Sequence, residues 1–224
     1  MTRAHTPPLR GAIFDMDGTL LDSMAMWRGA AAKLVRRHGR TPAPDLLQQI
    51  VAMPLAETVV YLVRQYRLEL SPVALKEEFE QYLAEQYGRR LQLKPGAAQL
   101  VNTLRAHGVP VALASATELP LIEAAMDRLG LLNSFCTVAS CQQYGSKQQP
   151  HIYLAVCRAM GLAPAETAVF EDSLVPLRTA RAAGCFAVMV EDAQSRPDWP
   201  QMAALADLQI ADLRAFEPGP LFGF

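Results

Sequence analysis

The chain has 224 residues, of which 51% are hydrophobic, and a formal net charge of −1 at pH 7. This length suits one large domain or a core with one modest insertion, and the apolar share is ample for a buried core. A nearly neutral chain gives no electrostatic reason to expect nucleic acid or an anionic membrane surface as a partner. The four cysteines are scattered without a CxxC pair, so we expect free thiols in a reducing cytoplasm.

Two further absences narrow the class of protein. The first ten residues, MTRAHTPPLR, lack the apolar stretch of a secretory signal. No apolar run reaches the length needed to span a bilayer, so no membrane partner is expected. Because no extended apolar surface can be identified from the sequence, we expect a monomer.

The first element in chain order is a strand at 11–15, a short apolar run that ends in an acidic loop. Between Ser23 and about residue 91, only helix patterns follow. Apolar stripes at helical spacing run through Met24 to Val35 and through Val59 to Tyr66. Ser71-Pro72 offers an N-cap and a proline at the first helical position, which predicts a third helix. We therefore expect a helical subdomain inserted behind the first strand.

After Lys94-Pro95-Gly96, short apolar runs alternate with helical segments, which is typical of an α/β domain with a mainly parallel sheet. The runs are continuous rather than alternating, as expected when helices cover both faces of the sheet. Further strands are expected at 110–115, 136–139, 167–171 and 186–190, with a weak edge strand at 208–210. Helices are expected at 121–129, 152–160 and 177–183, and an extended tail after Ala215.

The strongest local signal is Asp15-Met16-Asp17-Gly18, directly after the first strand. Ligand sites of open α/β sheets lie at the carboxyl ends of the strands. Two carboxylates on one tight turn can serve one reacting centre, one attacking phosphorus while the other moves protons. Taken alone, such a pair is more often a solvated acidic turn.

Three more features follow later strands. Ser115 closes one apolar run, where its hydroxyl could bind a phosphate oxygen or cap a helix. Lys147 lies in a polar loop, where it could neutralise phosphate or remain solvated. Glu171-Asp172 closes another run and offers hard oxygen ligands for Mg²⁺, or a helix-capping acidic pair.

In this order, the segments DMDGTLLDS, ALASAT, a loop lysine and FEDS resemble the haloacid dehalogenase-like hydrolase superfamily. The layout from about residue 9 to 212 is similar to its phosphoglycolate phosphatase and β-phosphoglucomutase branch. The resemblance implies an α/β fold, with a Rossmann-like, mainly parallel sheet core and an inserted α-helical cap. It places the catalytic core at 1–22 and 92–224 and the cap at 23–91.

The resemblance also implies roles for single residues. Asp15 matches the nucleophile that becomes a phosphoaspartate, and Asp17 matches the general acid and base. Ser115 and the backbone N–H of Ala116 match the groups that hold the phosphoryl group, and Lys147 matches the lysine of the motif.

The implied cofactor is Mg²⁺, held by the Asp15 side chain, the Asp17 carbonyl oxygen and Asp172. Glu171 is either a further ligand or a residue that supports the ligands. A phosphate ester cannot share a pocket with these carboxylates unless positive charge compensates for them. Mg²⁺ and Lys147 would supply that charge.

Three departures from the family pattern concern the lysine loop, the helix after FEDS and the cap. Gln148 and His151 replace a proline and an aspartate that many relatives carry near the lysine. Pro176 replaces a glycine, although proline suits the first turn of a helix. Trp27 and Leu55 stand where the sugar-phosphate mutases carry a histidine and an arginine, which weakens the case for mutase chemistry. Trp27 could line an apolar wall for the leaving group or simply pack the cap on the core.

The sequence therefore predicts a Mg²⁺-dependent cytoplasmic phosphatase that acts on a small phosphorylated metabolite. One alternative is a sugar-phosphate mutase of the β-phosphoglucomutase type. An alternative of another class is a catalytically idle binding protein that uses the same pocket.

Overall fold

The computed structural model describes residues 8–50, 53 and 55–224. The chain divides into two compact units, which are described separately below. The core unit comprises the described residues up to Asp22 together with Leu91–Phe224, and the helical unit comprises those of Ser23–Arg90. Among the described residues, no helix is long and apolar enough to cross a membrane.

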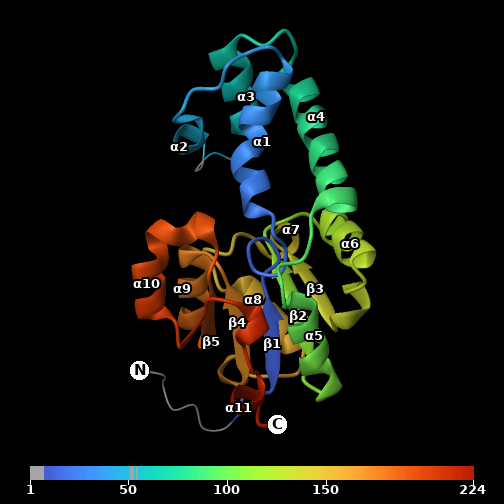
Figure 1. Ribbon diagram of the computed structural model, residues 1–224, viewed down its shortest axis with the longest axis vertical. Helices are drawn as coiled ribbons and strands as arrows, with labels where there is room; N and C mark the ends of the chain where they lie inside the picture. Colours follow the sequence, from blue (N-terminus) through green and yellow to red (C-terminus); the bar gives the residue numbers. More distant parts are fainter. Residues whose placement is uncertain (1–7, 51–52, 54) are drawn as a thin grey trace. The chain divides into compact units, whose positions relative to one another are not determined.

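The core unit is built on a six-stranded sheet with the order β3-β2-β1-β4-β5-β6 (Figure 1). Every neighbouring pair of strands is parallel. The residues of β1, β2, β4 and β5 are all buried, as the continuous apolar runs predict. The prediction of a mainly parallel α/β sheet is confirmed. The strands are β1 (Gly11–Phe14), β2 (Val111–Ser115), β3 (Thr137–Ser140), β4 (Thr167–Glu171), β5 (Phe186–Val190) and β6 (Leu208–Ile210).

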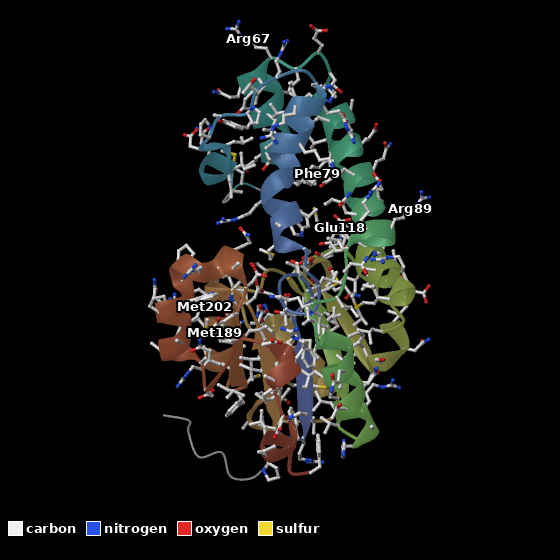
Figure 2. All side chains as sticks on the ribbon, viewed as in Figure 1. Arg67, Phe79, Arg89, Glu118, Met189 and Met202 are labelled. Carbon is white, nitrogen blue, oxygen red and sulfur yellow. The ribbon has the colours of Figure 1, made fainter. Side chains whose placement is uncertain are left out.

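Helices follow the strands of the core unit and pack against the sheet. Met202 of α10 and Met189 of β5 belong to one buried cluster and are labelled next to each other in Figure 2. A larger cluster joins Ile13 of β1 to Tyr153 and Cys157 of α8. The helices are α5 (Ala97–Ala106), α6 (Leu119–Arg128), α7 (Cys141–Tyr144), α8 (His151–Ala159), α9 (Leu174–Ala182), α10 (Trp199–Leu205) and α11 (Gly219–Phe222), with short 3-10 turns at Leu132–Ser134, Pro164–Glu166, Ala193–Asp198 and Leu213–Ala215.

The expectation of an extended tail after Ala215 is wrong. The tail contains the short helix α11, and Phe222 at its end is buried. The backbone N–H of Leu9, just before β1, donates to the carbonyl oxygen of Leu221 at 3.1 Å. The tail is therefore held by burial and by a hydrogen bond to the other end of the chain, which its prolines and glycines did not indicate.

The described elements of the helical unit are all helices, as the sequence indicates. Ser71 caps α4 as expected, and its hydroxyl oxygen accepts from the N–H of Ala74 at 3.1 Å. Trp27 packs against Phe79, and its indole N–H donates to the Tyr87 hydroxyl at 2.9 Å. Trp27 is half-buried and makes these contacts within the helical unit, where Figure 2 labels Phe79. The helices are α1 (Met24–Arg37), α2 (Leu46–Ile50), α3 (Leu55–Tyr66) and α4 (Pro72–Glu85), followed by a π-helical turn at Gln86–Arg90.

Two short segments of the core unit connect it to the helical unit, and they are paired with each other. Leu21 forms an antiparallel bridge with Leu93. The N–H of Asp22 donates to the carbonyl oxygen of Gln92 at 2.9 Å. The chain therefore leaves the core unit and re-enters it at adjacent points.

Candidate active site

The candidate site lies at the carboxyl ends of the central strands. In the sheet, β2 and β3 lie on one side of β1, and β4, β5 and β6 lie on the other. In open α/β sheets, ligands bind at the point where the strand order reverses in this way. Phe14 at the end of β1 is in register with Leu113 and Phe170. The next residue, Asp15, donates its N–H to the carbonyl oxygen of Phe170 at 3.0 Å. Asp15 therefore stands where the ends of β1, β2 and β4 meet.

The acidic loop after β1 is closed into a tight turn. The carbonyl oxygen of Met16 accepts from the N–H groups of Leu20 and Leu21, at 2.9 and 2.8 Å. Gly18 has a φ of 86°, a left-handed conformation that favours glycine, and its N–H donates to the Leu21 carbonyl at 2.9 Å. This turn holds Asp15 and Asp17 on one short, hydrogen-bonded segment.

Lys147 reaches into the site rather than into solvent. Its side chain is 7% exposed, and its Nζ lies 2.5 Å from Asp15 Oδ1 and 2.5 Å from Glu171 Oε1. The Tyr153 hydroxyl, from α8, donates to the same Glu171 oxygen at 2.8 Å. The interpretation of Lys147 as a solvated loop lysine is therefore excluded.

Three carboxylates of the site can converge on one cation. Oxygen atoms of Asp15, Glu171 and Asp172 all lie within 4.8 Å of one another, and all three residues are buried. Oδ2 of Asp172 is buried without a hydrogen-bond partner among the described residues. Since a buried carboxylate oxygen is rarely left unpaired, this atom fits a metal ligand. Hard oxygen ligands of this kind suit Mg²⁺.

The electrostatics of the site indicate a shortage of positive charge. Burial raises the pKa of Asp15 well above its ordinary value; Lys147 opposes this shift, and the negative charges of Glu171, Asp172 and Asp17 add to it. Burial, assisted by Glu171 and Asp192, raises the pKa of Asp172 to about 7. For Lys147, burial acts to lower the pKa, but the attraction of Asp15 and Glu171 outweighs it, so the pKa is raised. The ammonium of Lys147 contacts Asp15 and Glu171 but leaves the cluster with an excess of negative charge, which a divalent cation would offset.

The loop after β2 joins the acidic turn through Thr117. The Ser115 hydroxyl is buried and accepts from the N–H of Thr117 at 3.1 Å. The Thr117 hydroxyl donates to Asp17 Oδ2 at 2.6 Å. Ser115 does not cap α6, whose N-cap is Glu118, and Ala116 is exposed next to it. The structure thus places Ser115, Ala116 and Asp17 on connected segments.

The positions that depart from the family pattern lie away from these contacts. Gln148 and His151 are exposed, so the lysine loop does not use them to hold Lys147. Pro176 is the third residue of α9 and occupies its first turn, as expected.

The roles of Tyr153, Thr117 and Lys94 could not be predicted from the sequence. Tyr153 belongs to the apolar stripe of α8, and only its hydroxyl reaches Glu171. Thr117 lies within the ALASAT segment, which gives it a weak signal. The Lys94 ammonium donates to the carbonyl oxygen of Gly18 at 2.6 Å, and nothing in the sequence indicates this contact.

Comparisons with known proteins show the family of this chain. A family model described as haloacid dehalogenase-like hydrolase matches residues 9–184. Hexitol phosphatase A of Escherichia coli (strain K12) is 27% identical over 190 residues, covering 84% of this chain and 86% of that protein. Validoxylamine A 7'-phosphate phosphatase of Streptomyces hygroscopicus subsp. limoneus is 28% identical over 203 residues, covering 90% of this chain and 93% of that protein.

A solved structure shares the fold. The structure of CbbY from Rhodobacter sphaeroides in complex with phosphate matches with a TM-score of 0.74 and 22% identity, covering 92% of this chain and 96% of that chain. At that identity the likeness supports the fold alone, whereas the family model spans well over half of the chain. The chain belongs to the haloacid dehalogenase-like hydrolase family.

Proposed function

We propose that this protein is a phosphatase that hydrolyses a small phosphorylated sugar or polyol through an aspartyl phosphate on Asp15. One observation carries the proposal most directly: the buried carboxylates of Asp15, Glu171 and Asp172 lie close together, and the Lys147 ammonium contacts the first two. A cluster with this excess of negative charge suits a reaction that brings a cation and a phosphate ester together.

Each side chain has a distinct task in the proposed reaction. An Asp15 carboxylate oxygen forms a bond to phosphorus as the bond between phosphorus and the substrate alkoxide oxygen breaks. Asp17 gives its proton to that leaving oxygen and later takes a proton from the water that attacks the aspartyl phosphate. Inorganic phosphate leaves, and both carboxylates return to their first state. The Ser115 hydroxyl, the Ala116 N–H and the Lys147 ammonium hold the phosphoryl oxygens.

The residues present fit a Mg²⁺ ion. The Asp15 carboxylate, the Asp17 carbonyl oxygen and the Asp172 carboxylate would hold it. When bound, Mg²⁺ would neutralise charge on the nucleophile and on the phosphoryl oxygens. Oε1 of Glu171 already accepts from Lys147 and Tyr153, so Glu171 supports Lys147 and has one other oxygen for the ion.

The helical unit, Ser23–Arg90, is proposed to act as the cap that selects the substrate. A cap of this kind excludes bulk water during phosphoryl transfer and admits the water needed for dephosphorylation. The protein is further proposed to work as a cytoplasmic monomer, with no nucleic acid or membrane as a partner. Its four free cysteines support a reducing compartment.

The sugar or polyol class is supported by the relatives. One is named a hexitol phosphatase, and another, from Thermotoga maritima, is named a phosphorylated carbohydrates phosphatase. The test is phosphate release from a panel of hexitol, hexose and nucleoside monophosphates, phosphoglycolate and p-nitrophenyl phosphate. Turnover of a hexitol or hexose phosphate at least about tenfold faster than that of the other metabolites, in kcat/KM, supports this class. Preference for another metabolite rejects the class but leaves the phosphatase chemistry intact.

Two competing functions give different results. A mutase would convert β-glucose 1-phosphate into glucose 6-phosphate, whereas a phosphatase releases phosphate and glucose. An idle binding protein would cleave none of the panel, including p-nitrophenyl phosphate, in the presence of Mg²⁺. Asp15→Asn is the control for contaminating phosphatase, because activity that survives this change comes from another protein.

A further inference from the structure

Lys94 lies beside the acidic turn, although it is 76 positions away from Gly18 in the sequence. Its backbone N–H donates to the carbonyl oxygen of Leu20 at 2.8 Å. Its neighbour Leu93 is bridged to Leu21. The backbone of Lys94 is therefore fixed against the end of the turn that carries Asp15 and Asp17.

The Lys94 side chain also contacts the same turn, and all of its N–H donors form hydrogen bonds. Its Nζ donates to the Gly18 carbonyl at 2.6 Å, to the Glu191 carbonyl at 3.0 Å and to Asp192 Oδ2 at 3.0 Å. An ammonium has three N–H donors, so these bonds account for all of them. The side chain is only 16% exposed, which distinguishes it from a solvated surface lysine.

The far end of this contact is rigid. Asp192 is buried directly after β5, and its Oδ1 accepts from the N–H of Gln194 at 2.9 Å. Its carbonyl oxygen accepts from the Trp199 indole N–H at 3.2 Å. The neighbouring Glu191 donates its N–H to Ile210 of β6 at 2.9 Å. Lys94 thus connects the acidic turn to the segment after β5, which is held in place by other hydrogen bonds.

The other end of the Lys94 contact lies next to Asp17 in the chain. The Gly18 carbonyl follows Asp17 by one residue, and Gly18 has the left-handed φ that turns the chain. The bond from Lys94 to this carbonyl restrains the turn, while the Thr117 hydroxyl, in the loop after β2, donates to the Asp17 carboxylate. Both constraints act on the group that has to reach the leaving oxygen.

We propose that Lys94 is a positioning residue that, through Gly18, holds the Asp17 carboxylate in line with the leaving oxygen of the substrate. This role rests on the proposed phosphatase function. The three N–H donors of Lys94 are taken up by Gly18, Glu191 and Asp192, so we expect its loss to reach Asp17 through the turn. The loss should therefore be felt most where proton donation to the leaving group matters most.

The test replaces Lys94 by methionine, which is similar in length and has no ammonium. Two substrates are compared: the best alkyl phosphate of the panel and p-nitrophenyl phosphate, whose phenolate leaves with little help from an acid. A small misplacement of a catalytic group can slow a reaction by about a hundredfold, so kcat on the alkyl phosphate should fall roughly ten- to a hundredfold. On p-nitrophenyl phosphate the fall should be smaller, so the ratio of the two rates changes.

Two further variants separate positioning from stability. Arg181→Met removes another ion pair of the core unit, whose partner Asp207 is buried and lies 3.6 Å away. It should lower the melting temperature without changing the ratio of rates. Lys94→Met combined with Asp192→Asn removes the contact without leaving a buried unpaired carboxylate, and serves if the single variant does not fold.

The outcomes are distinct. A lowered alkyl-to-nitrophenyl ratio in the Lys94 variants, with the parent ratio in Arg181→Met, supports the role. The parent ratio in both Lys94 variants overturns it and leaves the phosphatase proposal standing. If the parent protein itself cleaves neither ester with Mg²⁺ present, the proposed function fails, and the role of Lys94 falls with it.

Discussion

Nζ of Lys147 lies 2.5 Å from Oδ1 of Asp15, although the two residues are 132 positions apart. This contact occupies one oxygen of the Asp15 carboxylate and restricts its rotation. A carboxylate held in this way has already lost part of the rotational freedom that an attack on phosphorus requires it to lose.

Asp15→Asn should abolish turnover, because an amide cannot form the acyl phosphate, while the near-isosteric side chain preserves the fold. The measurement is phosphate release together with thermal melting. Asp22→Asn is the matched control, since it makes the same chemical change at an exposed position on the same segment and should keep the parent rate. Residual activity of Asp15→Asn within about tenfold of the parent would contradict the assigned nucleophile.

Removal of metal should stop the reaction. Activity is expected to vanish in EDTA and to return with Mg²⁺, whereas Ca²⁺ should restore it poorly because its larger and looser coordination misplaces the nucleophile. Mg²⁺ should also raise the melting temperature of the parent protein, because a ligand of the folded state stabilises it. Asp172→Asn should show little of this increase. Full activity in EDTA would disprove the metal requirement.

Asp17→Asn should separate proton transfer from nucleophilic attack. The variant keeps its backbone carbonyl and its fold, but should lose roughly two to four orders of magnitude in rate, the usual worth of general acid–base catalysis. The loss should be larger with an alkyl phosphate than with p-nitrophenyl phosphate. Slow hydrolysis of the aspartyl phosphate should then produce a burst of nitrophenolate in stopped-flow measurements. Equal losses on both esters without a burst would show that Asp17 does not have this role.

The stability of the protein in EDTA should depend on pH through Asp172. Burial is the main cause that raises the pKa of this carboxyl from 3.8 to about 7. The folded protein therefore holds the proton more tightly than the unfolded chain does. The stabilisation from this group is complete below about pH 4 and is lost as the pH rises to about 7.

Asp172→Asn removes this titration. Relative to the parent, the free energy of unfolding of the variant should therefore increase between about pH 5 and pH 8. Urea denaturation of both proteins at the two pH values measures the change. Asp198→Asn, at a residue outside the site, is the control, and the difference between that variant and the parent should stay constant. A constant difference for Asp172→Asn as well would show that the pKa of Asp172 is not raised.

The sheet could be predicted from the sequence because each of its central strands is a short, continuous apolar run. The run at 186–190 is apolar at every position and is buried on both faces as β5. Helix α10 could not be predicted in the same way, because it has only 7 residues and is held by the contact of Met202 with the cluster on β5. Helix α11 likewise depends on Leu9, a partner from the far end of the chain.

The same distinction applies to the candidate site. Asp15, Lys147 and Asp172 follow strand ends, and their order along the chain predicted that they would meet. The hydroxyl of Tyr153 and the ammonium of Lys94 could not be assigned from the sequence, because each depends on the exact path of a remote segment. Tyr153 carries the pattern of an ordinary core residue, and Lys94 that of a polar residue before a turn.

The bridge between Leu21 and Leu93, together with the hydrogen bond from Asp22 to Gln92, has a consequence for how this protein can change over time. These contacts pair the two connecting segments of the core unit with each other, at the point where the insertion begins and ends. A different insertion could therefore be grafted between Asp22 and Gln92 without interrupting a strand of the sheet. The chain is in this sense modular, and an exchange of one segment could alter which ester is accepted while the residues that cleave it stay in place.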